Sequence, residues 1–456
     1  MPLSSNRSFR RRIRPAGAGL PGWILCVLLA LLFVQPVCAE EAVEYIDIRN
    51  PFLRKIPTAV PLFKNVTGGE RGGMLSRRLA DILAQTLAFT GYFEILDRQA
   101  FLADPRNPAV LGANIRFRNW TTIGAELLIT GTVRLSGDML ETELRLFDSF
   151  KEDLIIGKRY KGVEADHVRM IRRFCGDIML HLTGDRGVFE SRIAFVSASG
   201  DKKEIYTCDF DGGGPAAVTF KNSISRYPAW SSDAAYLAFT SYQKGKPDLY
   251  IQRLADKKEI VVDRRGFQIT PAWVPGKFQL AAAMSFSGDQ EIYLLTGEGK
   301  IINRLTKSRG IDVSPTWSPD GKLLAFVSRR SGTPQIYIKD MASERVRRLT
   351  FEGRYNTEPS WSPKGDRIAY SSQQDGRLDI HTIDVEGRNP MRLTQNQGDN
   401  ESPSWSPDGS LIAFSSTREG PSRIYVMTAF GTDQRRLLTL PGEQMDPKWS
   451  PNATEN

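Results

Sequence analysis

In the second half of the chain, short apolar segments alternate with polar turns on a period of about 44 residues. One kind of segment carries a central Ala; a second apolar segment follows it, and in most repeats a Leu-Thr pair ends the unit. Segments of this length, rich in β-branched and aromatic residues and bounded by turn residues, predict β-strands. The Ala-centred segments begin at Ile193, Leu237, Leu280, Leu324, Ile368 and Ile412.

A Pro-x-Trp motif marks one position in every repeat. Successive tryptophans of the motif are 43, 44, 44, 44 and 44 residues apart, and six of the eight tryptophans in the chain occupy it. Four short strands in a repeat of this length are typical of a propeller blade. We therefore predict a six-bladed β-propeller over residues 192–456, with the indoles packed as structural anchors. The motifs lie at residues 228–230, 271–273, 315–317, 359–361, 403–405 and 447–449.

The two ends of the repeat region complement each other. The first Ala-centred strand, at Ile193, has no Pro-x-Trp motif before it, and the last motif, at 447–449, has no Ala-centred strand after it. We expect the last strand to complete the first blade, because this closure removes the open sheet edges that would otherwise aggregate.

The segment before the repeats has a different pattern. Residues 40–185 alternate between strand spacing and the one-sided apolar stripe of amphipathic helices. Interleaved helices and strands predict a small α/β domain with a mixed sheet. The expected helices are 73–90 and 168–182 with a helical turn at 120–125, the expected strands are 44–48, 58–63, 93–96, 127–135, 140–147 and 154–160, and 185–191 is expected to be a linker.

The first 39 residues have the order of a secretory signal. A basic start with five Arg and no acidic residue precedes an apolar run of 12 residues from Trp23 to Val34, and Ala39 follows. The run is shorter than the ~20 residues that a spanning helix needs, which favours a cleaved signal. A membrane anchor is the alternative interpretation of this segment. We expect removal after Ala39 and a soluble mature protein in the periplasm, with the export route left open.

Composition is that of an ordinary soluble protein, with 41% hydrophobic and 25% charged residues. The formal net charge is +9 and becomes +4 without the five Arg of the signal. This mild charge gives little support to nucleic-acid binding. Two of the four cysteines, Cys26 and Cys38, lie in the signal. We expect Cys175 and Cys208 to be free buried thiols, with a disulfide between them as the alternative.

Residue types that carry catalysis or bind metals are sparse. The three histidines, His167, His181 and His381, lack Cys or acidic neighbours at metal-ligand spacing. Gly-x-Ser-x-Gly, His-Glu-x-x-His and a phosphate-binding Gly loop with Lys are all absent. Asp209 and Asp211 could touch a cation, but turn statistics favour a plain turn there. We expect no enzyme, no metal and no cofactor; a periplasmic hydrolase acting on glycan or peptide and a sensory propeller are the alternatives.

Motifs outside the repeat point to one family. The WSPDG, LAF, IY and LT repeats occur together with LADILAQTLAFTGYFEILD from Leu79, IGAELLITGTV from Ile123 and FCGDIMLHLTGDRGVFESRIAFVS from Phe174. Over nearly the whole mature chain this combination resembles the TolB family, the periplasmic components of the Tol–Pal system of Gram-negative envelopes. The resemblance implies a non-enzymatic protein that maintains outer-membrane integrity and supports constriction at cell division. It implies two partners, the peptidoglycan-associated lipoprotein at the propeller mouth and a TolA-like protein at the N-terminal segment; we expect a monomer.

Propeller topology places the six loops before the Pro-x-Trp motifs on one face around the axis. We expect apolar anchors and charged residues of these loops to form the lipoprotein site. Its candidates are Arg226, Tyr227, Phe267, Thr270, Asp312, Arg354, Tyr355, Asn356, Thr357, Glu358, Asp399, Asn400, Glu401, Met445 and Asp446. By resemblance, the TolA-like partner is expected on Val43, Glu44, Tyr45, Ile46, Asp47 and Ile48, where a strand could extend a partner's sheet or be an ordinary edge strand. The NPFLRKIP stretch that follows departs from the family pattern.

Overall fold

The computed structural model describes residues 54–102, 112–285 and 288–452. The expected signal, the expected strand 44–48 and the six TolA-binding candidates lie outside the described residues. Within the described residues, no helix combines the length and the hydropathy that crossing a membrane requires.

The N-terminal part is built on a mixed sheet in the order β3-β1-β4-β5-β6, with β2 pairing β4. β1 runs parallel to both β3 and β4, whereas β4, β5 and β6 form an antiparallel meander. The strands are β1 (Ile56–Ala59), β2 (Lys64–Asn65), β3 (Phe93–Ile95), β4 (Leu127–Ser136), β5 (Met139–Asp148) and β6 (Asp153–Val163). The helices are α2 (Gly69–Phe89), α3 (Phe117–Thr121) and α4 (His167–Thr183), with single 3-10 turns at Arg98–Ala100, Gly112–Asn114 and Glu164–Asp166.

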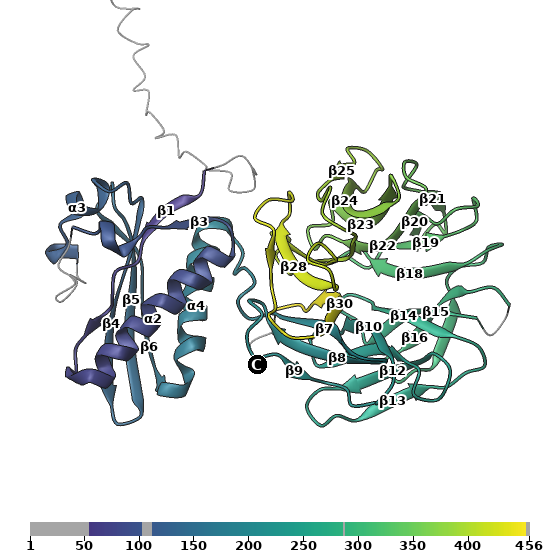
Figure 1. The fold of residues 1–456 in the computed structure, drawn as a ribbon, viewed down its shortest axis with the longest axis horizontal. Coiled ribbons are helices and arrows are strands. Elements are labelled where there is room, and N and C mark those ends of the chain that lie inside the picture. Colours follow the sequence, from purple (N-terminus) through teal and green to yellow (C-terminus); the bar gives the residue numbers. More distant parts are fainter. Residues whose placement is uncertain (1–53, 103–111, 286–287, 453–456) are drawn as a thin grey trace, which may run out of the picture. The chain divides into compact units, whose positions relative to one another are not determined.

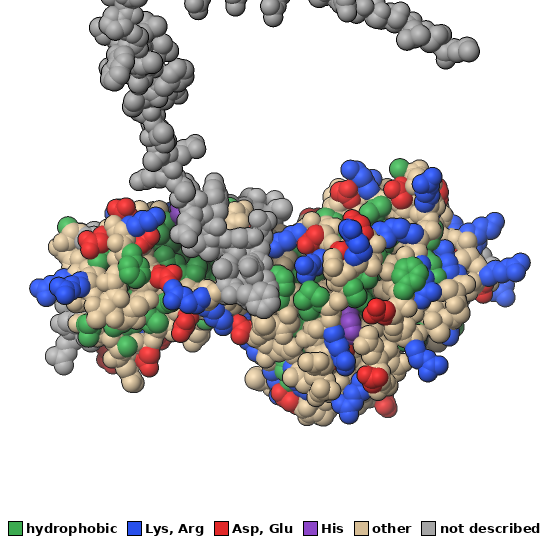
Figure 2. All heavy atoms as spheres, turned by 90° about the horizontal axis from the view of Figure 1, so that it is seen from above, with side chains coloured by type: hydrophobic (Ala, Val, Ile, Leu, Met, Phe, Trp, Pro, Cys, Tyr) green, Lys and Arg blue, Asp and Glu red, His purple; other side chains and the backbone are tan. Residues whose placement is uncertain are grey.

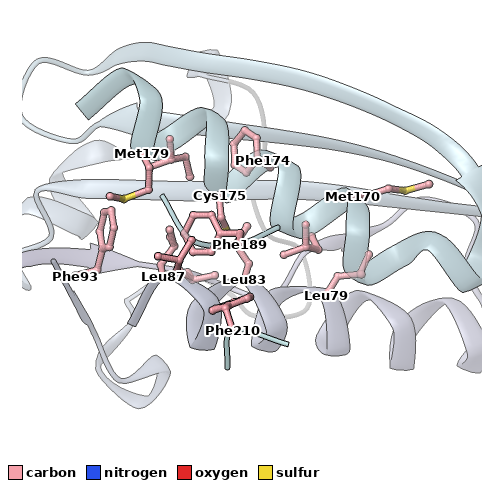
Figure 3. Packing of buried hydrophobic residues seen from close by; sticks show 14 of the residues in the cluster. Leu79, Leu83, Leu87, Phe93, Met170, Phe174, Cys175, Met179, Phe189 and Phe210 are labelled. Atoms are coloured by element: carbon pink, nitrogen blue, oxygen red, sulfur yellow. The ribbon is translucent and has the colours of Figure 1, made fainter. Parts of the chain in front are cut away.

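Helices α2 and α4 lie side by side over this sheet (Figure 1). Their apolar stripes meet in one core, where Leu79, Leu83 and Leu87 of α2 and Phe174 and Cys175 of α4 are fully buried (Figure 3). Such stripes are what the sequence pattern predicts for helices that cover a sheet. Helix α4 stops at Gly184, which takes the left-handed conformation that favours glycine.

Two expectations for this part were wrong in detail. The expected strand 58–63 ends at Ala59, because the chain turns away from the sheet there and Phe63 is buried without strand pairing. The expected linker 185–191 is part of the core: Val188 is fully buried, and Phe189 packs edge-on against Phe210 with ring centroids 5.6 Å apart. Val188 and Phe189 are buried because removing their apolar surface from water is favourable.

The repeats form a six-bladed β-propeller, as predicted, and Figure 1 shows the blades arranged around one axis. Each blade is a four-stranded antiparallel sheet whose first strand lies nearest the axis. The first blade consists of β30 (Glu443–Trp449), β7 (Arg192–Ser199), β8 (Lys202–Asp209) and β9 (Ala216–Ala217). The second consists of β10 (Ser225–Trp230), β11 (Tyr236–Ser241), β12 (Asp248–Arg253) and β13 (Glu259–Val262).

The other four blades repeat this plan. The third consists of β14 (Gln268–Trp273), β15 (Gln279–Met284), β16 (Glu291–Thr296) and β17 (Ile301–Arg304). The fourth consists of β18 (Asp312–Trp317), β19 (Leu323–Ser328), β20 (Gln335–Asp340) and β21 (Val346–Arg348). The fifth consists of β22 (Tyr355–Trp361), β23 (Arg367–Gln374), β24 (Arg377–Asp384) and β25 (Met391–Arg392), and the sixth of β26 (Asn400–Trp405), β27 (Leu411–Ser416), β28 (Arg423–Thr428) and β29 (Arg435–Arg436).

The C-terminal strand closes the ring, as expected. β30 pairs antiparallel with β7, with Trp449 opposite Ile193, and the Ser450 amide donates to the Arg192 carbonyl at 2.7 Å. This pairing joins residues more than 240 positions apart in the sequence. It leaves neither β30 nor β7 as an exposed strand edge.

Packing bears out the structural interpretation of several residues. All six motif tryptophans are buried, with 7–8% of their surface exposed. Cys175 and Cys208 are both buried and unbridged, and burial raises the pKa of the Cys208 thiol to about 12. His381 is a packed strand residue as expected, because it is buried and its ring stacks on Tyr370 at 5.6 Å.

Candidate docking site at the propeller mouth

The innermost strand of every blade carries the same distortion just before its proline. The residue at this position has a positive φ between 51° and 56°, and the pairing with the second strand shifts register there. A positive φ is uncommon for residues other than glycine, and a bulge turns a side chain away from the direction that regular pairing would give it. The six residues are Tyr227, Thr270, Ser314, Glu358, Ser402 and Asp446.

These six residues surround a pocket of about 60 Å³ on the propeller axis. Prolines of four of the motifs and Lys448 complete its wall. Because the bulge recurs once per blade, the ring results from the repeat itself, and only the side chains differ from blade to blade. Two of the six ring residues are acidic, which makes the ring chemically asymmetric.

Both acidic ring residues are held by their neighbours. Asp446 receives a two-pronged contact from the Arg226 guanidinium, at 2.9 Å from Nε and 2.8 Å from Nη2. Glu358 accepts from the Ser371 hydroxyl at 2.9 Å and from the amide and hydroxyl of Ser402 at 2.8 and 3.0 Å. Bidentate, charge-assisted contacts of this kind fix a carboxylate in one orientation. The charges of the ring are therefore preorganised.

Glu401 lies beside this ring in strand β26. The pKa of its carboxyl is raised to about 7, first by burial and then by the negative charges of Glu358, Asp399 and Asp446. The Arg226 guanidinium opposes this increase. Glu401 is thus a carboxyl group that changes charge near neutral pH.

Lys448 is the one charged residue at the middle position of the Pro-x-Trp motif. The other five blades carry small residues there, namely Ala229, Ala272, Thr316, Ser360 and Ser404. Burial lowers the pKa of the Lys448 ammonium, while Glu358 and Asp446 act in the opposite direction. The long side chain lines the axial pocket. Lys448 therefore adds a long basic side chain to the wall of the pocket that the two acidic ring residues also line.

One end of the propeller, here called the mouth, collects the loops that enter the first strands and the loops that join the second and third strands. Sequence analysis expected the candidate residues to lie in the entering loops, but most of them belong to the first strands. The entering loops themselves are 218–224, 263–267, 305–311, 349–354, 393–399 and 437–442.

Three polar candidates are buried inside the blades, which corrects the expectation that they orient a partner directly. The Asp312 carboxylate pairs with Arg330 at 2.8 Å. The Asn356 amide donates to Gln335 at 2.8 Å, and the equivalent Asn400 donates to Asp379 at 3.0 Å. Such contacts engage part of each buried polar group, whereas Oδ1 of Asp312 and Oδ1 of Asn356 have no hydrogen-bond partner among the described residues. These residues are buried within the blades, next to the mouth loops.

The other candidates are more accessible to different degrees. Phe267 is 49% exposed and Tyr355 is 43% exposed, and Arg354 between blades is exposed as well. The half-buried candidates are Arg226, Tyr227, Thr270, Thr357, Glu358, Asp399, Glu401 and Met445, whereas Asp446 is buried. Met445 packs against the core of the first two blades. The structure therefore brings Phe267, Arg354 and Tyr355 to the surface of the mouth.

Sequence reasoning missed three exposed aromatic side chains at the mouth. Phe220 is 69% exposed, Phe351 is 70% exposed and Tyr242 is 37% exposed. Phe220 and Phe351 each follow directly on the Thr that ends a repeat. An aromatic residue directly after Val-Thr or Leu-Thr lies beyond the fourth strand of its blade. This sequence position could have identified Phe220 and Phe351 as exposed.

Comparisons with known proteins agree with this architecture. Residues 44–155 match the TolB amino-terminal domain family, and residues 180–453 match the TolB beta propeller domain family. The chain is 58% identical over 282 residues to the Tol-Pal system protein TolB of Desulfosudis oleivorans and 44% identical over 285 residues to the protein TolB homolog of Chlorobaculum tepidum. Each match covers 62% of this chain and 64% of the relative's length.

A solved structure extends the likeness to both parts of the chain. The crystal structure of TolB from Acinetobacter baumannii superposes with a TM-score of 0.76 at 25% identity, covering 88% of this chain and 97% of that one. A propeller whose family match spans residues 180–453, preceded by the matching amino-terminal domain, shows that the chain belongs to the TolB family.

Proposed function

We propose that this protein is a periplasmic, non-catalytic component of the Tol–Pal system whose propeller mouth binds the peptidoglycan-associated lipoprotein. The observation that carries the proposal is the mouth itself. Exposed Phe267 and Tyr355 each lie three residues before a residue that lines the axial pocket, and the charged groups of this pocket are already oriented. Exposed aromatic anchors around oriented polar groups are what a protein-binding surface requires.

The proposal of binding without catalysis also fits the chemistry of the pocket. The carboxylate oxygens of Glu358 and Asp446 accept hydrogen bonds from Ser371, Ser402 and Arg226. A general base or a nucleophile needs a neighbour that activates it and a free position for the reacting atom. Among the described residues, no cluster of three or more His, Cys, Asp or Glu could hold a metal ion.

The test removes one cation and one aromatic ring from the mouth. Arg354→Ala combined with Tyr355→Ala is expected to weaken binding of the purified periplasmic domain of the organism's own peptidoglycan-associated lipoprotein at least about tenfold, because anchors at a mouth dominate affinity. Isothermal titration calorimetry measures the change, and circular dichroism verifies that the variant is folded. The matched control, Lys364→Ala with Met391→Ala, removes one cation and one apolar side chain at the opposite end of a blade and is expected to bind normally. An unchanged affinity for the mouth variant would remove this assignment.

The same proposal includes a TolA-like partner on the N-terminal segment Val43–Ile48, which lies outside the described residues. A peptide of residues 40–50 is expected to bind the purified periplasmic domain of the organism's TolA-like protein, because an apolar strand with alternating acidic residues can extend a partner's sheet. Fluorescence anisotropy of the labelled peptide measures this, with a scrambled peptide as control. Equal anisotropy changes for both peptides would contradict the assignment.

A further inference from the structure

An excess of cations without ion-pair partners stands along one side of the mouth. Six basic residues there are exposed, and none forms an ion pair with another described residue. Several other cations at the mouth are neutralised: Lys246 contacts Asp248 and Asp263, Arg304 pairs with Glu291 and Arg392 pairs with Asp379. Lys202 of the first blade and Arg377 of the fifth are exposed without an ion pair among the described residues, but each stands apart from the other unpaired cations. The six residues, here called the basic arc, are Arg264, Arg265, Lys307, Arg309, Arg329 and Arg354.

The basic arc is continuous although it comes from several loops. Hydrogen bonds donated by backbone amides join each loop to the next, which places the cations on one surface. These contacts are Ser285 amide to Phe267 carbonyl at 3.1 Å, Gly310 amide to Asp289 carboxylate at 3.3 Å, Arg329 amide to Ile311 carbonyl at 3.0 Å and Asn356 amide to Pro334 carbonyl at 3.0 Å. The arc therefore follows the mouth from the second blade to the fourth.

Acidic residues along the same loops do not cancel the arc. Asp263 is engaged by Lys244 and Lys246, and Asp312 is buried against Arg330. Asp289 and Glu352 are exposed, so these two negative charges oppose the six positive charges of the arc. Figure 2 shows Lys and Arg side chains standing out from the propeller surface among exposed apolar ones. A surface with one sign of charge attracts a partner of the opposite sign.

Aromatic side chains stand at both ends of the arc. Phe267 follows directly on Gly266 after Arg264 and Arg265, and Tyr355 follows directly on Arg354. Phe351, whose ring lies 4.9 Å from the Arg348 guanidinium, is close by in the same loop as Arg354. Apolar anchors supply contact area while a charged rim selects the partner and its orientation. The arrangement fits a folded protein surface that carries carboxylates next to an apolar patch.

We propose that the basic arc recognises a carboxylate-rich face of the lipoprotein that docks at the mouth, and that it sets the orientation and the association rate of docking. This inference rests on the proposed function. Paired cations would contribute little to such a contact, because their charges are already neutralised within the blade. The unpaired cations lie on one side of the mouth only, so a partner face with carboxylates is favoured in the orientation that brings them over this side.

The experiment measures lipoprotein binding as a function of salt. In Arg309→Glu with Arg329→Glu, affinity for the purified periplasmic domain of the lipoprotein is expected to fall about tenfold or more at low ionic strength, mostly through slower association. The difference from wild type is expected to shrink in about 0.5 M NaCl, where the Debye length drops to a few Å. Surface plasmon resonance gives both rates. The control, Lys277→Glu with Lys364→Glu, reverses two exposed cations at the opposite end of the blades and is expected to bind like wild type.

The outcomes separate the two proposals. If wild-type protein binds the lipoprotein and the arc variant binds with the same rates and the same salt dependence, the basic arc has no part in recognition while the proposed function stands. If wild-type protein does not bind the lipoprotein at all, both proposals fail. If the arc variant keeps its lipoprotein affinity but loses binding to vesicles of anionic phospholipid that wild type binds, the arc serves a membrane surface and the inference is overturned.

Discussion

At the scale of single residues, the motif tryptophans do more than fill space. The indole Nε1 of four of them donates to the carbonyl of the middle motif residue in the preceding blade, at 2.9–3.3 Å. Each such bond joins two neighbouring blades through a position that the repeat supplies automatically. Trp361 departs from this pattern, because its indole makes a local 3.4 Å contact with Gly365.

This difference predicts unequal effects of the same substitution. Trp405→Phe keeps an aromatic ring but removes the 3.1 Å bond to Ser360 of the neighbouring blade. We expect the free energy of unfolding to fall by about 1–3 kcal/mol, because a buried carbonyl loses its donor. Trp361→Phe, the matched control, loses only the longer local contact and is expected to cost less. Denaturant unfolding of both variants provides the measurement, and equal losses would contradict the interblade role.

Glu401 predicts a pH dependence of stability. Its pKa of about 7 in the fold exceeds the value of about 4.3 in an unfolded chain, so the native state holds more protons between these values. The free energy of unfolding therefore decreases as the pH rises through that window. Glu401→Gln is expected to reduce this decrease by up to roughly 3 kcal/mol between pH 4.5 and 7.5. Denaturant unfolding at both pH values measures it, and parallel pH profiles of wild type and variant would contradict the raised pKa.

At the scale of elements, the strand that closes the ring differs from every other strand in its distance along the chain from its partner. β30 and β7 lie at opposite ends of the repeat region in the sequence, yet they pair in the first blade. Its tryptophan is tied to the start of the propeller, because the Trp449 indole donates to the Ser191 hydroxyl at 2.6 Å. Closure therefore couples the two ends of the propeller directly.

Removal of this strand tests the closure. A chain that ends at residue 442 lacks β30 and is expected to expose the edge of β7, so that it self-associates and unfolds at lower temperature. Light scattering after size exclusion and a thermal melt report the two effects. A chain that ends at Asn452 keeps β30 and its contact from the Asn452 side chain to the Gly187 carbonyl at 2.9 Å, and it is expected to behave like wild type. A monomeric, equally stable 442-residue chain would refute the role of the strand.

At the scale of the whole molecule, the N-terminal sheet and the propeller share one apolar core. Phe210 of the first blade packs edge-on against Phe89 of α2 at 5.2 Å and against Phe189 of the connecting segment. Arg172 of α4 adds a polar contact, since its guanidinium reaches Asp209 at 2.9 Å and Asp211 at 3.0 Å. Asp209 and Asp211 lie at a turn, as expected, and this turn contacts helix α4 through Arg172.

Arg172 offers a test of this contact. Arg172→Met keeps much of the apolar side chain but leaves Asp209 and Asp211 without their cation, and we expect a loss of about 1–2 kcal/mol in unfolding free energy. Cleavage within 185–191 by a nonspecific protease is expected to become faster, because local opening is easier. Arg169→Met removes an exposed Arg of the same helix whose one ion pair among the described residues is with Asp166, and it serves as the control. Equal cleavage rates for both variants, followed by mass spectrometry, would show that Arg172 does not secure the segment.

Sequence alone determined the number of blades, their strands, the closing strand and the buried tryptophans, because each follows from a repeated local pattern of turns, apolar strands and fixed spacing. It also identified both long helices from their apolar stripes. Only the tertiary structure decided which mouth residues are exposed. Asp312, Asn356 and Asn400 resemble surface residues in sequence, yet partners from another strand bury them. The basic arc is likewise invisible in sequence, because its cations come together only when loops of successive blades touch and other acids have already been neutralised.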